Sequence, residues 1–153
     1  MTTAVRVEIT RELHTSLARQ GIDSGVFISA FKEWKTNWPK HEYNSALFGK
    51  DGSYIAPKVD GMSYQLRHVH LVPLIDEAAL SNWKKVFRRF GRKTSDRVLV
   101  YAGDNRGVYL LIYILDEPAA HEIADMRTPT HKAIMHGFAE VAAAFLEDGS
   151  IIR

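Results

Sequence analysis

Two histidines placed two positions apart are the residues of this chain best suited to acid–base chemistry. His68 and His70 lie in the segment 63–72, whose alternating side chains predict a strand. Both imidazoles would then lie on one face, about 7 Å apart, with Val69 and Leu71 on the other. Because imidazole titrates near neutral pH, such a pair suits a general acid and a general base. The alternatives are buried structural histidines, a metal site with no obvious third ligand nearby, and packing beneath a neighbouring helix.

Cationic residues are concentrated in a segment that follows this strand. The chain has a net charge of +2, yet residues 50–103 hold ten basic and five acidic residues, whereas residues 104–153 hold four and eight. A dense basic block binds phosphate groups when its side chains share a face, and otherwise forms a solvated helix end. Against one acid, Asp96, the block contains Lys84, Lys85, Arg88, Arg89, Arg92, Lys93 and Arg97.

Two further positions could handle protons or anions. Tyr101 follows the basic block on a predicted strand and shares a face with Arg97 and Leu99. An arginine there could clamp a phosphate while the phenol transfers a proton, or Tyr101 could be a wall residue of an amphipathic strand. His131 lies in the first turn of the last predicted helix, where free backbone N–H groups favour an anion.

Hydrophobic spacing predicts the elements that hold these residues. Strands are expected at 4–9, 63–72, 97–102 and 108–115, and the last two form a hairpin at the centre of the sheet. Helices are expected at 10–20, 27–38, 76–90 and from Thr128 to Gly149. The glycine-containing segment 39–62 is predicted to be a long loop. This order predicts an α+β fold with helices on one face of a mostly antiparallel four-stranded sheet.

Composition sets the class of protein. With 153 residues, 46% of them apolar and 25% charged, the chain is predicted to form a single soluble domain over residues 1–153. The absence of cysteine excludes a disulfide scaffold, a thiolate metal site and a cysteine nucleophile. No apolar stretch reaches the ~18–20 residues of a membrane span, and the N-terminus lacks the apolar core of a signal peptide. A cytoplasmic protein with a polyanionic partner is expected.

Six short motifs together carry a family resemblance. In order and approximate spacing they resemble the YafO family of bacterial type II toxins over residues 46–146, whereas residues 1–45 match weakly. The motifs are Phe48-Gly49-Lys50-Asp51 with Tyr54, Arg67 to Leu71, Phe90 with Arg92, Asp96 leading to Leu99-Val100-Tyr101, His121 to Ala124, and His131-Lys132 with Ala139-Glu140 and Phe145.

The resemblance implies a RelE-like fold and a ribosome-dependent mRNA endoribonuclease that is neutralised by a cognate antitoxin. The expected partners are therefore mRNA, the ribosome and the antitoxin. In the expected chemistry, the 2′-hydroxyl of the RNA attacks the adjacent phosphate. That reaction needs a base, an acid and cations that stabilise the phosphorane, without a metal or another cofactor.

Roles follow from residue chemistry at the matching positions. His68 and His70 are the candidate base and acid, Arg92 or Arg97 the cation, and Tyr101 the group that orients the phosphate. The secondary candidates are Asp51, Tyr54, Asp96, Arg97, His121 and His131. Asp51 would orient a histidine or stabilise its glycine-rich turn, and His121 could approach the same face. The candidate RNA-binding residues are Lys84, Lys85, Arg88, Arg89 and Lys93.

Two other classes of function compete with the nuclease. A ParE-like gyrase poison would use the same fold without catalytic residues, and a basic RNA-binding module would need only the cationic block. Replacing both His68 and His70 would abolish the toxicity of a nuclease and spare that of an inhibitor that acts through another surface.

Overall fold

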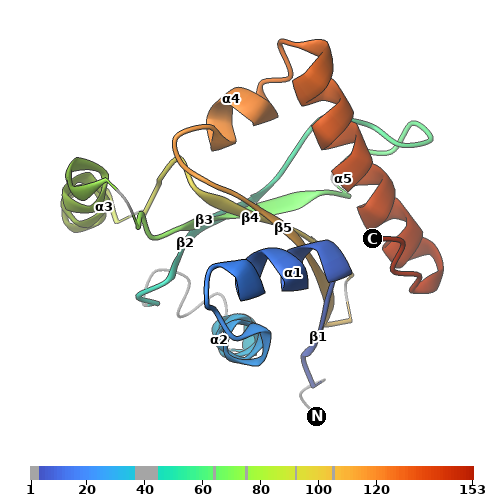
Figure 1. Ribbon diagram of the computed structural model, residues 1–153, viewed down its shortest axis with the longest axis horizontal. Coiled ribbons are helices and arrows are strands. Elements are labelled where there is room, and N and C mark those ends of the chain that lie inside the picture. Colours follow the sequence, from blue (N-terminus) through green and yellow to red (C-terminus); the bar gives the residue numbers. More distant parts are fainter. Residues whose placement is uncertain (1–3, 37–44, 64, 75, 92, 105) are drawn as a thin grey trace.

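The computed structural model describes residues 4–36, 45–63, 65–74, 76–91, 93–104 and 106–153, and its centre is a five-stranded mixed sheet (Figure 1). The strand order is β1-β5-β4-β3-β2, and every neighbouring pair is antiparallel except β1 with β5. The strands are β1 (Arg6–Ile9), β2 (Phe48–Ser53), β3 (Arg67–Leu71), β4 (Val98–Gly103) and β5 (Val108–Leu115).

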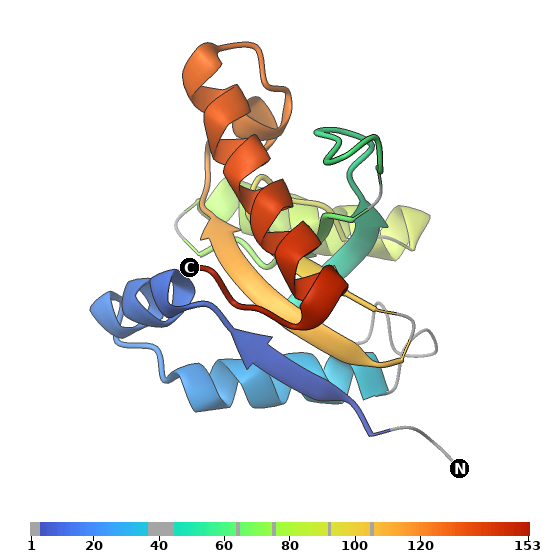
Figure 2. The same cartoon turned by 90° about the vertical axis from the view of Figure 1, so that its right-hand side faces the viewer.

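Helices cover both faces of this sheet. Figures 1 and 2 show α1 (Arg11–Arg19) and α2 (Ser24–Thr36) on one side and α4 (Ala120–Ala124) and α5 (Pro129–Asp148) on the other. The fifth helix, α3 (Glu77–Phe90), connects β3 to β4 and stands at one end of the sheet (Figure 1). Within the described part of the chain, no helix is long and apolar enough to cross a bilayer.

The helix ends follow from local sequence. Thr10 caps α1 by accepting a hydrogen bond from the Leu13 backbone, and its hydroxyl donates to the Ile112 carbonyl. Asp76 caps α3, which ends at Gly91 in the left-handed conformation. Thr128 caps α5 immediately before a proline in the first turn. Side-chain acceptors at N-caps and glycine after the last turn satisfy backbone groups that a helix end leaves unpaired.

Because side chains alternate between the two faces of each strand, the sheet has a hydrophobic core on each side. Val69, Leu99 and Tyr101 pack in the core beneath α1 and α2, whereas Val98 and Val100 pack beneath α4 and α5. His68 lies opposite Val100 in the sheet and His70 opposite Val98, so both histidines lie on the α4–α5 side. The predicted division of the 63–72 segment into two faces is confirmed.

Two fold predictions are wrong. The sheet has five strands because β2 forms inside the segment 39–62 that was predicted to be a loop. Its sequence, Phe-Gly-Lys-Asp-Gly-Ser, has no apolar alternation, and the strand is defined by its pairing with β3. Gly49 is required there, because a Cβ would lie 2.6 Å from the Trp83 ring and 2.5 Å from the Lys93 carbonyl oxygen.

The helices were predicted on one face and occupy both. The strands β4 and β5 carry apolar side chains on each side, so two layers of helix are needed to bury them. The short helix α4 was also not predicted. Trp38, predicted within the second helix, lies outside the described residues.

A buried charged cluster fastens four elements on the α1–α2 side. The Asp51 carboxylate of β2 accepts hydrogen bonds from Lys35 of α2 at 2.9 Å, from Arg67 of β3 at 3.1 Å and from the Tyr101 hydroxyl of β4. The side chains of Asp51 and Lys35 are only 1% and 5% exposed. Burial, followed by the Asp51 charge, raises the pKa of Tyr101 well above its usual value. The phenol therefore acts here as a neutral hydrogen-bond donor.

This cluster should make Asp51 important for stability. Asp51→Asn leaves Lys35 and Arg67 without their shared counter-charge, and breaking a buried ion pair in this way costs about 3–5 kcal/mol. Asp125→Asn is the matched control, because Asp125 pairs with Arg127 at an exposed site and its loss should cost less than about 1 kcal/mol. Urea unfolding measures both variants. Equal losses would contradict the structural role of the cluster.

Candidate active site

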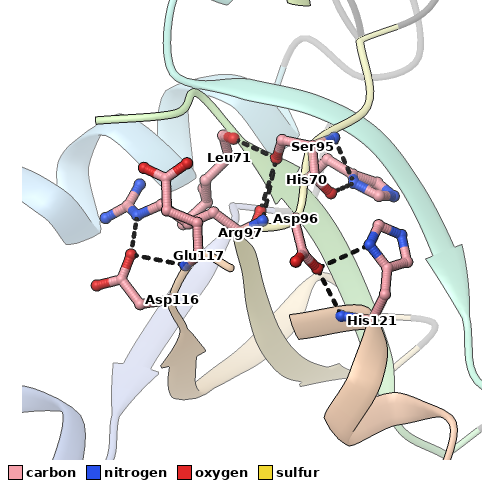
Figure 3. Close-up of polar contacts among 8 residues, drawn as sticks. All are labelled: His70, Leu71, Ser95, Asp96, Arg97, Asp116, Glu117 and His121. Carbon is pink, nitrogen blue, oxygen red and sulfur yellow. Dashed lines mark hydrogen bonds and ion pairs between the residues drawn. The ribbon is translucent and has the colours of Figure 1, made fainter. Parts of the chain in front are cut away.

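Three imidazoles form a row on the α4–α5 side of the sheet. The His68 and His70 ring centroids are 5.7 Å apart, and the His70 and His121 centroids are also 5.7 Å apart. His121 comes from α4, so an element that was not predicted adds a third ring to the predicted pair. Figure 3 shows the rings of His70 and His121 next to each other, with Ser95 and Asp96 beside them.

His70 is held by the backbone of Ser95. Its Nδ1 atom lies 2.7 Å from the Ser95 carbonyl oxygen and 3.0 Å from the Ser95 amide nitrogen. A protonated Nδ1 donates to the carbonyl and leaves the Nε2 lone pair as a base. An unprotonated Nδ1 accepts from the amide and leaves Nε2–H as a donor. Both tautomers therefore have a partner at Nδ1, which leaves Nε2 as the nitrogen that could exchange a proton with a ligand.

His121 is held by the next residue of the same segment. Asp96 Oδ1 accepts hydrogen bonds from the His121 backbone nitrogen at 2.7 Å and from its ring Nδ1 at 2.8 Å. A carboxylate in this position orients the ring and can pair with its protonated form. The His121 side chain is largely exposed and lines a hollow at this side of the sheet.

These two histidines border a cleft of about 510 Å³. Its walls bring together a cation, a carboxylate, hydrogen-bonding side chains and imidazoles from β2, β3, α3, the segment 94–96 and α4. The residues that line it include Lys50, His70, Asn82, Thr94, Asp96 and His121. The arrangement can bind an anion beside two proton-transfer groups.

Burial keeps two of the imidazoles neutral. Burial first, and then the neighbouring His70, lowers the pKa of His68 to about 4. Burial also lowers the pKa of His70. The His68 ring stacks on Tyr54 with centroids 4.2 Å apart, and within the described residues its buried Nδ1 has no hydrogen-bond partner. His70 borders the cleft, whereas His68 supports it from behind.

The structure brings some predicted site residues together and separates others. Asp96 and His121 join His70 at the cleft, and Tyr54 stacks on His68. Tyr101 and Asp51 are buried on the opposite side of the sheet, so neither reaches these histidines. Asp51 was expected to orient a histidine or to stabilise its glycine-rich turn. Its carboxylate instead accepts hydrogen bonds from Tyr101, Lys35 and Arg67.

The remaining candidates lie elsewhere. Arg97 is buried, pairs with Asp116 at 3.1 Å, and points away from the cleft (Figure 3). His131 lies at the start of α5 and does not line the cleft. Lys93, predicted to bind RNA, has a buried side chain, and its ammonium donates to the Ser45 carbonyl at 2.6 Å. Arg92 lies outside the described residues.

Sequence reasoning missed four polar residues of the cleft, Lys50, Asn82, Thr94 and Ser95. Lys50 belongs to a motif that carried the family resemblance, but its place on the histidine side follows only once β2 is known to pair with β3. Asn82 lies one helical turn after Ala79, which also lines the cleft. Its place at the cleft can be predicted only when the orientation of α3 is known. Among the described residues, no three His, Asp or Glu side chains are placed to hold a metal ion.

Comparison with known families agrees with the resemblance. A family model described as "Toxin YafO, type II toxin-antitoxin system" matches residues 32–147, more than half of the chain. The matched range contains all the residues that line the cleft. Comparison with curated proteins and with solved structures gives no match.

The buried state of His68 predicts a pH-dependent stability. Its pKa is about 4 in the folded protein and 6.5 as the ordinary value, so its stabilising effect is complete above pH 6.5 and is lost as the pH falls toward 4. For a shift of this size, roughly 2 kcal/mol of unfolding free energy is lost between pH 7 and pH 5. The variant His68→Phe keeps a ring on Tyr54, but this ring does not titrate. Between pH 7 and pH 5 the variant should therefore lose about 2 kcal/mol less unfolding free energy than the wild type.

Urea unfolding of the wild type and of His68→Phe at pH 7 and pH 5 measures this difference. The same loss in both proteins would show that His68 is not held in its neutral form by burial.

Proposed function

The chain belongs to the YafO toxin family of type II toxin–antitoxin systems, and on that premise we propose that it is a ribosome-dependent endoribonuclease that cleaves translated mRNA. The single observation that carries this proposal is the pairing of His70 and His121 at the cleft. Consecutive residues, Ser95 and Asp96, engage their Nδ1 atoms, so both Nε2 atoms are left for proton transfer. A mostly antiparallel sheet with an open cleft on one face supports the RelE-like scaffold that the resemblance implies.

The proposed reaction is transesterification within the RNA. The 2′-oxygen forms a bond to the adjacent phosphorus, and the bond from phosphorus to the 5′-oxygen breaks. His70 is the proposed base, because its lowered pKa keeps Nε2 unprotonated at neutral pH, and it takes the 2′-hydroxyl proton. His121 is the proposed acid: with Asp96 at its Nδ1, the protonated ring donates from Nε2 to the leaving 5′-oxygen. Lys50 is placed to offset the negative charge that develops on the phosphorane.

The other candidates have supporting places in this proposal. The ring of His68 packs against that of His70, and Tyr101 holds β4 to β2 through Asp51. Both are positioning residues here, because neither lines the cleft. Arg92 stays a proposed second cation for the phosphate.

The basic helix α3 is the proposed ribosome and mRNA contact. Lys84, Lys85, Arg88 and Arg89 are all exposed on it. Lys85 and Arg89 lie three and seven positions after Asn82, which places them on the flank of the helix that borders the cleft. Phosphate contacts from these two residues would extend the path of the RNA beyond the scissile bond.

The catalytic assignment predicts that His70→Ala and His121→Ala each lower cleavage strongly. Loss of a general acid or base typically costs about 10²–10⁴-fold in rate. Primer extension on an abundant message after induced expression measures new 5′ ends, with growth followed in parallel. His136→Ala is the matched control, since His136 is exposed on α5 and pairs with Glu140 away from the cleft. Growth arrest with intact message in both the wild type and the variants would favour a non-catalytic inhibitor.

The phosphate contacts predict a salt-dependent loss. Lys85→Ala combined with Arg89→Ala removes two phosphate contacts, so sedimentation with ribosomes should weaken and its dependence on salt concentration should become shallower. Both residues are exposed, so thermal unfolding should change little. Unchanged association across salt concentrations would remove α3 from the ribosome contact.

A further inference from the structure

A second hollow lies on the other flank of α3. It has a volume of about 410 Å³, and its lining is mostly apolar. Leu80, Trp83 and Phe87 of α3 form its apolar floor, and Val72 and Ala46 also line it. We call this hollow the α3 groove.

Helical spacing separates this groove from the catalytic cleft. Leu80, Trp83, Lys84, Phe87 and Arg88 recur at intervals of three and four, and all five line the groove. Asn82, Lys85 and Arg89 recur at the same intervals on the flank that borders the cleft. The basic block of α3 is therefore two stripes with different surroundings, one along an apolar groove and one along the cleft.

The groove carries positive charge around an apolar floor. Lys84 and Arg88 are exposed along it, Lys93 lines it, and no described residue of its lining is acidic. Lys93 is only 8% exposed, its ammonium donates to the Ser45 carbonyl, and it lies 4.7 Å from the centroid of the Phe87 ring.

Lys93 has no counter-charge in the described part of the chain, where no ion pair includes it. Burial lowers its pKa, because desolvation disfavours the charged form. A carboxylate that entered the groove would supply the missing negative charge.

These features favour a protein segment over RNA. Trp83 is only 3% exposed, so its ring face is not available to stack on a base. The apolar floor between positions 80 and 87 spans about 10 Å at the helical rise, which matches about two turns of a partner helix. Aliphatic side chains of such a segment would cover Leu80 and Phe87 while its carboxylates met the cations on either side.

We propose that the α3 groove binds an acidic amphipathic segment of the cognate antitoxin. The proposal depends on membership of the toxin family, which implies an antitoxin, and not on the nuclease mechanism. A bound segment would place protein along the flank of α3 opposite the RNA path.

Two charge-reversal pairs on the same helix test the proposal. Lys84→Glu with Arg88→Glu changes the groove stripe, and Lys85→Glu with Arg89→Glu is the matched control on the cleft stripe. Binding of the purified cognate antitoxin to each full-length variant is measured by calorimetry, and binding of ribosomes by sedimentation. Lys93→Met is the second groove variant, because it removes the buried charge at similar volume without introducing a repulsive one.

The groove pair should weaken antitoxin binding by about tenfold or more, since reversed charges are repulsive as well as unpaired. Lys93→Met should weaken antitoxin binding too, whereas the control pair should leave it within about twofold and lose ribosome binding instead. Equal weakening by both pairs, or by neither, would overturn the proposal. If the groove pair lost ribosome binding and kept antitoxin binding, the groove would belong to RNA. Loss of message cleavage has no bearing on these outcomes, so the nuclease proposal can fail independently.

Discussion

The site depends on how the segment 93–97 is fastened across the ends of β2 and β3. The Lys93 carbonyl accepts from the Lys50 amide at 2.8 Å, and the Arg97 carbonyl accepts from the Leu71 amide at 2.7 Å. Between these two points, the Ser95 hydroxyl lies 2.6 Å from the Leu71 carbonyl oxygen and 2.9 Å from that of Arg97. With both ends of the segment bound, the backbone of Ser95 meets His70 and the carboxylate of Asp96 meets His121. Two imidazoles from separate elements are thereby oriented by one short stretch of chain.

The sheet separates the buried charged cluster from the histidine cleft. Successive side chains of β3 point to opposite faces, so Arg67 enters the Asp51 cluster while His68 lies on the histidine side. Asp51 and Lys35 are almost fully buried in this cluster because their opposite charges are paired, whereas Arg67 stays partly exposed, and the cluster holds β2 against β3 and β4. The histidine side keeps a cleft open between α3 and α4. A well-anchored strand with a charged cluster behind it is a rigid support for the histidines that we propose transfer protons.

The parts of the fold that local sequence controls could be predicted. Alternation placed His68 and His70 on one face, the Gly103–Gly107 turn joined β4 to β5, and threonine, aspartate and glycine marked the helix ends. Features that depend on tertiary contacts could not be predicted from local sequence. β2 has no apolar alternation and is defined by its pairing with β3. The position of Lys50 at the cleft and the contacts of Asp51 therefore could not be predicted.

The contact of His121 with Asp96 spans 25 positions, and no local pattern indicates it. Tyr101 was predicted as an active-site residue from its type and its basic neighbours, yet the two-sided core buries it on the other face. The basic block was predicted to form one surface. The helical periodicity of α3 places its basic residues in two stripes, and the two flanks of the helix border different hollows.

The central claim is that His70 and His121 catalyse attack by the 2′-hydroxyl of the RNA itself. The most direct measurement is the chemical identity of the new 3′ ends on message cleaved by the wild-type protein on ribosomes, with a chelator present. This mechanism predicts a 2′,3′-cyclic phosphate or the 3′-phosphate formed by its hydrolysis, with a 5′-hydroxyl on the downstream fragment. A 3′-hydroxyl paired with a 5′-phosphate would mean that water attacked the phosphorus, and would contradict the account.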